Sequence, residues 1–185
     1  MLDLSRVTLF AIHVAFDKTK TVAQDFQDGE KEKKLDNGLE DTIRALHTCI
    51  ESAKFGAVRF ITSNNVIDER GKELLEDGIV CEKPSIPINN MKDYARYMIY
   101  HLHEHVVTDF VLTIQHDGFI LNPEAWRDEF FDYDYIGAPW PWREQGFVTP
   151  FGEHIAVGNG GFSLRSKKLT EVPTKVDVPF DVVAM

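Results

Sequence analysis

An apolar run, Phe110-Val-Leu-Thr-Ile114, is followed at once by the polar tetrapeptide Gln115-His-Asp-Gly118. An apolar run without alternation is typical of a strand that is buried on both faces of a parallel sheet. In open α/β sheets, ligands bind beyond the carboxyl ends of the strands, which is where Asp117 would stand. The run therefore predicts a central strand with a binding site at its end. The alternative interpretation is a simple turn after a strand.

The composition is that of one globular domain. The chain has 185 residues, of which 43% are hydrophobic and 27% are charged. A net charge of −10 argues against a nucleic-acid-binding or anionic-membrane surface. No apolar run approaches the length of about 18 residues that a transmembrane helix needs, and the N-terminus lacks the pattern of a signal peptide. We therefore expect a cytoplasmic protein, with Cys49 and Cys81 as reduced core thiols.

Strands and helices alternate along the first two thirds of the chain. This pattern predicts a three-layer α/β sandwich with a mainly parallel central sheet, as one domain over residues 1–185. The expected strands are Val7–Val14, Ala57–Thr62, Ile79–Cys81 and Phe110–Ile114, and the expected helices are Gly38–Phe55, Glu69–Glu76 and Asn90–His105. We expect Gly56 to end the first helix and Asn90 to cap the third.

The remaining segments have weaker patterns. Residues 17–37 are rich in charge and predict a solvated loop, with a flap over a ligand as the alternative. Residues 179–185 are apolar and have no stop signal, so truncation of the C-terminus is one interpretation. The other expected features are a short helix over Ala125–Phe131, short strands at Ile155–Val157 and Gly161–Leu164, and a helix cap at Ser166.

Glycine and aromatic residues cluster after residue 130. The segment Gly158-Asn-Gly-Gly161 matches neither the dinucleotide fingerprint nor a P-loop. Its glycines permit a ligand to approach the backbone closely, and they equally permit a tight hairpin. The rings of Tyr133, Tyr135 and Pro139-Trp-Pro-Trp142 suit stacking on sugars or bases, or form a small satellite core.

Histidines and acids offer further candidate sites. The segment His101-Leu-His-Glu-His105 is not a zinc motif, and we expect it on a solvated helix face. Asp132 and Asp134 alternate with aromatic residues, so either could serve as a general base, with solvated surface acids as the alternative. No nucleophile elbow or cysteine–histidine pair supports covalent hydrolysis.

Three blocks together resemble the DUF5672 family, whose members are similar to GT-A glycosyltransferases. The blocks are Gln115-x-Asp-Gly-x-x-Leu-Asn-Pro-x-x-Trp126, Tyr133-Asp-Tyr-Ile-Gly-Ala-Pro-Trp140 and Gly158-Asn-Gly-Gly-Phe-Ser-Leu-Arg-Ser166. The segments 45–58 and 94–109 match as well, so the resemblance covers most of the chain outside residues 17–37.

The resemblance implies a fold that binds a UDP- or GDP-sugar donor together with Mn²⁺ or Mg²⁺. Asp117 matches the metal-binding acid of the Asp-x-Asp position, whereas Gln115 replaces the first acid, with His116 as a supporting group. The other implied donor- or acceptor-binding residues are His13, Val14, Ser63, Asn64, Asn65, Tyr135, Trp140, Trp142, Asn159, Gly160 and Gly161.

We therefore expect a glycosyltransferase that moves a sugar from a nucleotide donor to a glycan or another acceptor. Asp117 would hold the metal, and Asp132 or Asp134 would act as the base. A non-catalytic nucleotide-sugar-binding module is the first alternative, because Gln115 departs from the acid pair. A metal-dependent phosphohydrolase ranks lower, because its usual acid-rich metal cluster is missing from the sequence.

Overall fold

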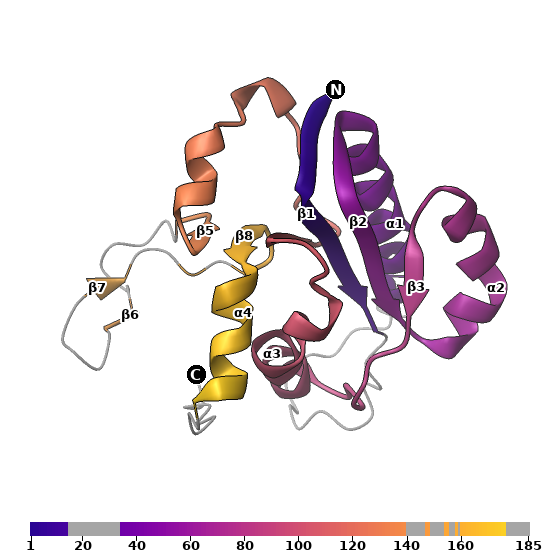
Figure 1. Cartoon of the computed structure of the whole chain (residues 1–185). Coiled ribbons are helices and arrows are strands. Elements are labelled where there is room, and N and C mark those ends of the chain that lie inside the picture. The colour runs from indigo at the N-terminus through magenta and orange to yellow at the C-terminus, as the bar shows by residue number, and fades with distance from the viewer. Residues whose placement is uncertain (15–33, 140–146, 149–153, 156–157, 159, 177–185) are drawn as a thin grey trace.

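The computed structural model describes residues 1–14, 34–139, 147–148, 154–155, 158 and 160–176. The central sheet has six strands in the order β3-β2-β1-β4-β8-β5 (Figure 1). The strands β1 to β4 pair in parallel, whereas β8 runs antiparallel to both β4 and β5. The expected α/β architecture with a mainly parallel sheet is therefore confirmed.

The elements up to β4 follow one another in the chain order that the sequence pattern predicted, with some shifted bounds, whereas β5 and β6 lie where no strand was expected. The strands are β1 Leu2–His13, β2 Ala53–Thr62, β3 Val80–Glu82, β4 Phe110–Ile114, β5 Tyr135–Gly137, β6 Phe147–Val148, β7 His154–Ile155 and β8 Ser163–Ser166. The α-helices are α1 Lys34–Ser52, α2 Asn64–Glu76, α3 Met91–Tyr100 and α4 Lys167–Lys175, and the 3₁₀ helices are η2 Leu102–His105, η3 Pro123–Ala125 and η4 Asp128–Asp132.

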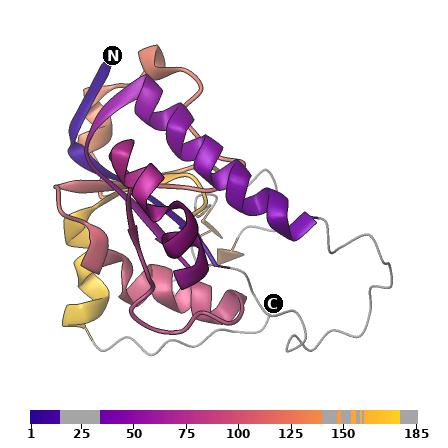
Figure 2. The same ribbon diagram turned by 90° about the vertical axis from the view of Figure 1, so that its right-hand side faces the viewer.

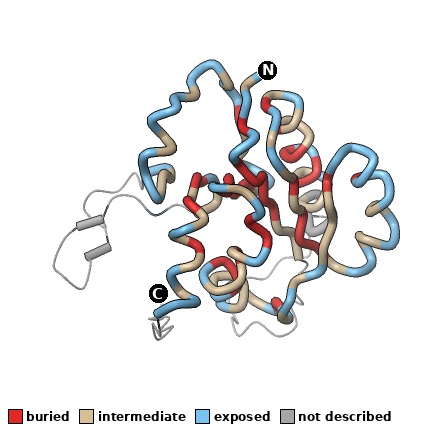
Figure 3. Tube along the Cα trace, in the orientation of Figure 1, coloured by how far each residue is buried: buried red, intermediate tan, exposed pale blue. Residues whose placement is uncertain are grey.

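Helices cover both faces of the sheet and make three layers. On one face, α1 and α2 bury apolar side chains against the strands, among them Ile43, Leu46, Cys49 and Leu74. On the other face, α3 and η2 bury Tyr97, Met98 and Leu102 against Phe10, Ile61 and Val111. Figure 2 shows α1 running along its face, and Figure 3 shows that buried residues concentrate on the central strands. All five residues of β4 are buried, as expected for a central strand.

The boundary between α1 and β2 differs from the prediction. The helix ends at Ser52, and β2 begins at Ala53, which pairs with Leu2 of β1. Gly56 therefore lies inside the strand, and the prediction that it ends the helix was wrong. The physical reason is a close backbone approach, since a Cβ on Gly56 would come within 2.2 Å of the Ser5 carbonyl oxygen.

The helix α2 begins earlier than predicted. Ser63 is its N-cap residue and has an extended conformation, and the Ile67 N–H donates to the Ser63 carbonyl at 3.1 Å. Asn64 and Asn65 therefore form the first turn of a helix rather than a loop. The sequence correctly predicted that a polar segment follows β2, but the prediction that this segment is a loop was wrong.

The predicted helix over Asn90–His105 is two elements. Asn90 caps α3 as predicted, since its side chain accepts a hydrogen bond from the Asp93 N–H at 2.9 Å. The α-helix ends at Tyr100, and η2 follows. His105 is buried between Tyr97 and Glu82, so its expected place on a solvated face was wrong. Among the described residues, no group of three or more His, Cys, Asp or Glu side chains could hold a metal ion.

The segments after β4 are short and irregular. The helix expected over Ala125–Phe131 is divided between the 3₁₀ helices η3 and η4. The strand expected at Gly161–Leu164 lies at Ser163–Ser166 as β8, and Ser166 caps α4 by accepting from the Leu169 N–H at 3.0 Å. Residues 17–33 lie outside the described residues, and Lys34–Asn37 belong to α1. None of the described helices has the length and apolar character to cross a bilayer.

Both cysteines are free, and burial should make the Cys49 thiol unreactive. The thiol is enclosed in the core and accepts a hydrogen bond from the Ile120 N–H, and burial raises the pKa of Cys49 to about 11. Because the thiolate is the reactive species, we expect alkylation at pH 8 about 100-fold slower than for an ordinary thiol. Time-resolved mass spectrometry with iodoacetamide measures this rate. Labelling of the native Cys49 as fast as in denaturant would contradict the buried position.

Candidate functional site

The carboxyl edge of the sheet gathers several loops in one place. His13 of β1 pairs with Thr62 of β2, and Ala11 pairs with Ile114 of β4, so the segments after these strands leave the sheet side by side. Because β8 is antiparallel to β4, its first residue Ser163 pairs with Thr113 near the same edge. The structure therefore brings the residues before β8 to the end of β4, although some 45 positions separate them in the sequence.

A tight turn presents Asp117 at this edge. Gln115 and Gly118 form an antiparallel bridge, and the Gly118 N–H donates to the Gln115 carbonyl at 3.1 Å. His116 and Asp117 lie at the exposed tip of this turn. A Cβ on Gly118 would come within 3.1 Å of the Phe162 Cβ, so the glycine lets the turn pack against the segment before β8. Asp117 is thus an exposed carboxylate beside the glycine-rich segment.

Gln115 is held by α3. Its amide Nε2 donates to the Tyr94 hydroxyl at 3.0 Å. Burial raises the pKa of Tyr94, so its hydroxyl is protonated at neutral pH. The residue that replaces the first acid of the Asp-x-Asp position therefore ties the end of β4 to α3 through its amide nitrogen. Its amide oxygen is the group that could face a ligand.

His13 and His116 form a second pair of groups at the edge. His13 is half-buried at the end of β1. Burial lowers the pKa of His13, and the electrostatic interaction with His116 lowers it further. A histidine with a lowered pKa is neutral at pH 7 and can accept a hydrogen bond or bind a metal ion. Val14 packs against the apolar core on the α3 face.

A buried polar cluster lies beneath the segment before β8. The hydroxyls of Thr113 and Ser163 lie 2.8 Å apart, and the Thr113 hydroxyl donates to the Gly160 carbonyl at 3.0 Å. Arg165 joins the cluster, since its Nε donates to the Ser163 hydroxyl at 3.1 Å and its Nη2 to the Gly160 carbonyl at 3.4 Å. The guanidinium carbon also lies 5.6 Å from the ring centre of Tyr135. These bonds fix the backbone at Gly160.

Sequence reasoning missed Arg165 and Tyr94. Arg165 lies in the glycine-containing block that carried the family resemblance. The sequence does not indicate, however, where the side chain of a single arginine in a strand extends. Tyr94 lies on the predicted apolar face of its helix, where a core role is the default interpretation. The polar positions Thr113 and Ser163 in otherwise apolar strands were the signal that could have located a buried polar cluster.

The structure does not bring Asp132 or Asp134 to this edge. Ser166, which pairs with Phe110 at the amino end of β4, donates from its hydroxyl to the Asp134 carboxylate at 2.6 Å. That hydrogen bond lowers the pKa of Asp134. Asp132 lies near the start of β1, around a surface depression that Asp3 also lines. The length of β4 separates both acids from Asp117, so the structure gives no support to their expected role as general base.

Of the other predicted site residues, some lie at the carboxyl edge, one lies away from it, and others are outside the described residues. Ser63 follows β2 at the carboxyl edge, next to the end of β1, with Asn64 and Asn65 exposed on the first turn of α2. Tyr135 pairs with Arg165 rather than reaching the edge itself. Gly161 lies with Gly160 before β8. Trp140, Trp142 and Asn159 lie outside the described residues.

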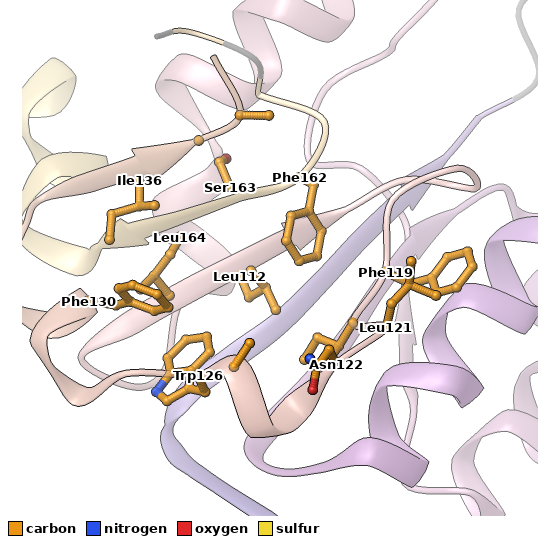
Figure 4. A pocket seen from close by; sticks show the side chains of 14 residues that line it. Leu112, Phe119, Leu121, Asn122, Trp126, Phe130, Ile136, Phe162, Ser163 and Leu164 are labelled. Carbon is orange, nitrogen blue, oxygen red and sulfur yellow. The ribbon is translucent and has the colours of Figure 1, made fainter.

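An apolar pocket of about 430 Å³ lies beside the turn, on the sheet face that α1 also covers. Its lining includes Phe162, which contacts Gly118, and the strand residues Leu112 and Leu164. Figure 4 shows Trp126 and Phe130 closing the side opposite Phe162. The candidate site thus has a polar edge at Asp117 and an apolar recess next to it.

The sequence profile of the DUF5672 family, described as a protein of unknown function, matches residues 79–176. This range is more than half of the 185 residues and holds β4, the Asp117 turn, β8 and Arg165. The chain belongs to the DUF5672 family. The resemblance that the three blocks indicated is confirmed, and the family range of this DUF5672 protein includes the polar cluster described above.

The DUF5672 protein was also compared with solved structures. It is similar to 4-diphosphocytidyl-2C-methyl-D-erythritol synthase from Anaerococcus prevotii, with 12% sequence identity and a TM-score of 0.48. The match covers 97% of this chain and 79% of that chain. None of the curated proteins matches the sequence.

Proposed function

We propose that this DUF5672 protein is a glycosyltransferase that binds a nucleotide-diphosphate sugar at the carboxyl edge of its sheet. One observation carries the proposal. The fold places the exposed Asp117 carboxylate beside the glycine segment that precedes β8, and Gly118 packs directly against Phe162. A carboxylate and close-approaching backbone at a strand end suit a phosphorylated ligand and its cation.

The residues present fit a cation that arrives with its ligand. Mg²⁺ and Mn²⁺ need only one or two carboxylates when substrate phosphates and waters complete the coordination. Asp117 supplies a carboxylate, and the amide oxygen of Gln115 and the ring of His116 are within the same turn. When bound, such a cation would offset the negative charge of the departing diphosphate. Because the described residues form no preformed metal cluster, the metal should bind weakly without nucleotide.

The other residues have supporting roles in this proposal. His13, neutral at pH 7, and Ser63 lie where the nucleotide would extend along the edge. Gly160 and Gly161 would leave room for the donor sugar, and Tyr94 would orient the Gln115 amide. The acceptor, a glycan or another hydroxyl compound, would enter from the side of the sugar. The polar cluster under Gly160 would keep these groups in place without solvent reorganisation.

Isothermal titration calorimetry tests the proposal. UDP and GDP are titrated into the protein with Mn²⁺ and with EDTA, and Mn²⁺ is titrated alone. We expect metal-dependent nucleotide binding that Asp117→Ala weakens about 100-fold, since the variant removes the carboxylate that the described residues bring to the site. Asp132→Ala is the matched control, because it removes an exposed acid at the other end of the sheet. Absence of nucleotide binding by the folded protein would refute the proposal.

A binding module without turnover is the second candidate. The observation that favours it is the Gln115 side chain, whose amide nitrogen is engaged by Tyr94 where the Asp-x-Asp pattern has an acid. The two candidates differ in one measurement, the release of free nucleotide from a UDP- or GDP-sugar. Metal-dependent release supports the transferase, whereas tight donor binding without release supports the module.

A further inference from the structure

We infer that Arg165 is an anion-binding residue, and that it contacts the diphosphate of the ligand. This inference rests on the proposed function, because it adds a cation to the same site. The starting point is the position of the guanidinium. Arg165 lies in β8 opposite Val111, and its side chain extends along the strand to Ser163 and Gly160, toward the edge at which β4 ends.

The guanidinium is partly buried without a carboxylate among the described residues. Burial lowers the pKa of Arg165, and the neighbouring titratable groups are the phenols of Tyr135 and Tyr94. Salt bridges do join Arg59 to Glu82, Arg70 to Glu40 and Arg6 to Asp109. Arg165 differs from these arginines, since no ion pair within the described part of the chain includes it. A buried cation normally has an anionic partner, so the arrangement calls for one.

Contacts within the described part of the chain leave guanidinium donors available for such an anion. A guanidinium has five N–H donors in a planar fork. Contacts to described residues occupy the Nε donor and one Nη2 donor. The others can form the parallel pair of hydrogen bonds by which arginine binds phosphate oxygens. The Tyr135 ring lies near the guanidinium carbon and favours its charged form.

Gly160 makes room for this arrangement. A Cβ at residue 160 would lie 2.8 Å from the Arg165 Nη2, so any larger residue would displace the guanidinium. The obstacle is the flexible end of a side chain rather than backbone, and alanine at 160 should therefore move Arg165 without unfolding the sheet. The glycine-rich segment and the arginine thus form one unit. Gly160 is the positioning residue, and Arg165 is the residue that contacts the anion.

The test compares four variants by calorimetry with three probes, which are inorganic diphosphate, UDP with Mn²⁺, and uridine. We expect Arg165→Gln to weaken binding of diphosphate and UDP by about 10- to 100-fold, the usual range for a charge-assisted pair of hydrogen bonds. Uridine should bind both proteins alike, because it has no phosphate. Gly160→Ala should weaken diphosphate several-fold. The matched controls Arg59→Gln and Gly71→Ala should leave the affinities unchanged.

The outcomes separate this inference from the proposed function. If the wild type binds neither UDP nor GDP, the proposed function fails and the inference fails with it. If the wild type binds UDP and a folded Arg165→Gln binds it within about twofold as tightly, the inference alone is overturned. Should Arg165→Gln not fold, Gly160→Ala decides, since unchanged diphosphate affinity in that variant would equally overturn the role of Arg165.

Discussion

Replacing Gly56 with alanine is expected to lower the free energy of unfolding by about 3 kcal/mol or more. Gly56 lies in β2 at the point where its register with β1 shifts between Leu4 and Thr8. An added Cβ would lie 2.2 Å from the Ser5 carbonyl oxygen and 2.7 Å from the Thr108 Cγ2. Backbone of the neighbouring central strand cannot yield as a side chain can, so the pairing of β1 with β2 would have to open locally.

Urea denaturation followed by circular dichroism measures this effect. Gly71→Ala is the matched control, because Gly71 lies in α2 and the closest atom to its added Cβ would be a side-chain carbon at an ordinary 3.4 Å. That change should stabilise the protein by up to about 1 kcal/mol. Equal stability of Gly56→Ala and the wild type would show that the two strands do not approach each other as described.

The sequence predicted the features that depend on local pattern. The apolar run of β4 and the caps at Asn90 and Ser166 follow from residue type and spacing alone, and all three are confirmed. The α/β architecture follows from the alternation of strands and helices. Asp117 could be placed at a strand end for the same reason, since a buried strand must surface where its apolar run stops.

The errors come from pairing between distant segments. Gly56 resembles a helix terminator until its contact with Ser5 of another strand is known. His105 resembles a solvated residue until Glu82 and Tyr97 are placed beside it. Asp134 resembles a site residue until the antiparallel direction of β8 is known. Ser163 at the start of β8 lies near the site, whereas Ser166 at its end, which binds Asp134, lies at the opposite end of β4.

The Arg165 cluster shows the same limit within the site. Its members are Thr113 of β4, Tyr135 of β5, Gly160 before β8, and Ser163 and Arg165 of β8, and each is an ordinary residue in its own segment. The contacts of Arg165 with Ser163 and Gly160 are local in sequence. The direction of the guanidinium also depends on Tyr135 of β5 and Thr113 of β4, the two strands that flank β8 in the sheet. The buried polar cluster of the site therefore depends on tertiary contacts, whereas the position of Asp117 in an exposed turn follows from the local sequence.

Replacing His105 with leucine is expected to lower the free energy of unfolding by about 2 to 4 kcal/mol. The His105 ring is buried, with Nδ1 at 2.8 Å from a Glu82 carboxylate oxygen and Nε2 at 2.7 Å from the Tyr97 hydroxyl. Tyr97 is fully buried, and Glu82 also accepts a hydrogen bond from Arg59. Leucine fills the space but removes one hydrogen-bond partner from each group. The Glu82 carboxylate keeps only Arg59, and the Tyr97 hydroxyl keeps only the long contact with the Ser85 N–H, so both buried groups are less well satisfied among the described residues.

A double-mutant cycle with Tyr97→Phe separates the polar contact from the packing of the ring. If the hydrogen bond stabilises the fold, the two changes should couple by about 1 kcal/mol. In the Tyr97→Phe background there is no buried hydroxyl that loses a partner when His105 is replaced. His101→Leu is the matched control, since His101 contacts Ser85 and Glu104 in more exposed surroundings and should cost less than about 1 kcal/mol. Equal losses from His105→Leu and His101→Leu would mean that the Glu82–His105–Tyr97 chain does not hold β3, α3 and η2 together. With the expected inequality, a buried polar chain fixes the α3 layer to the sheet, and through Tyr94 that layer sets the position of Gln115 at the site.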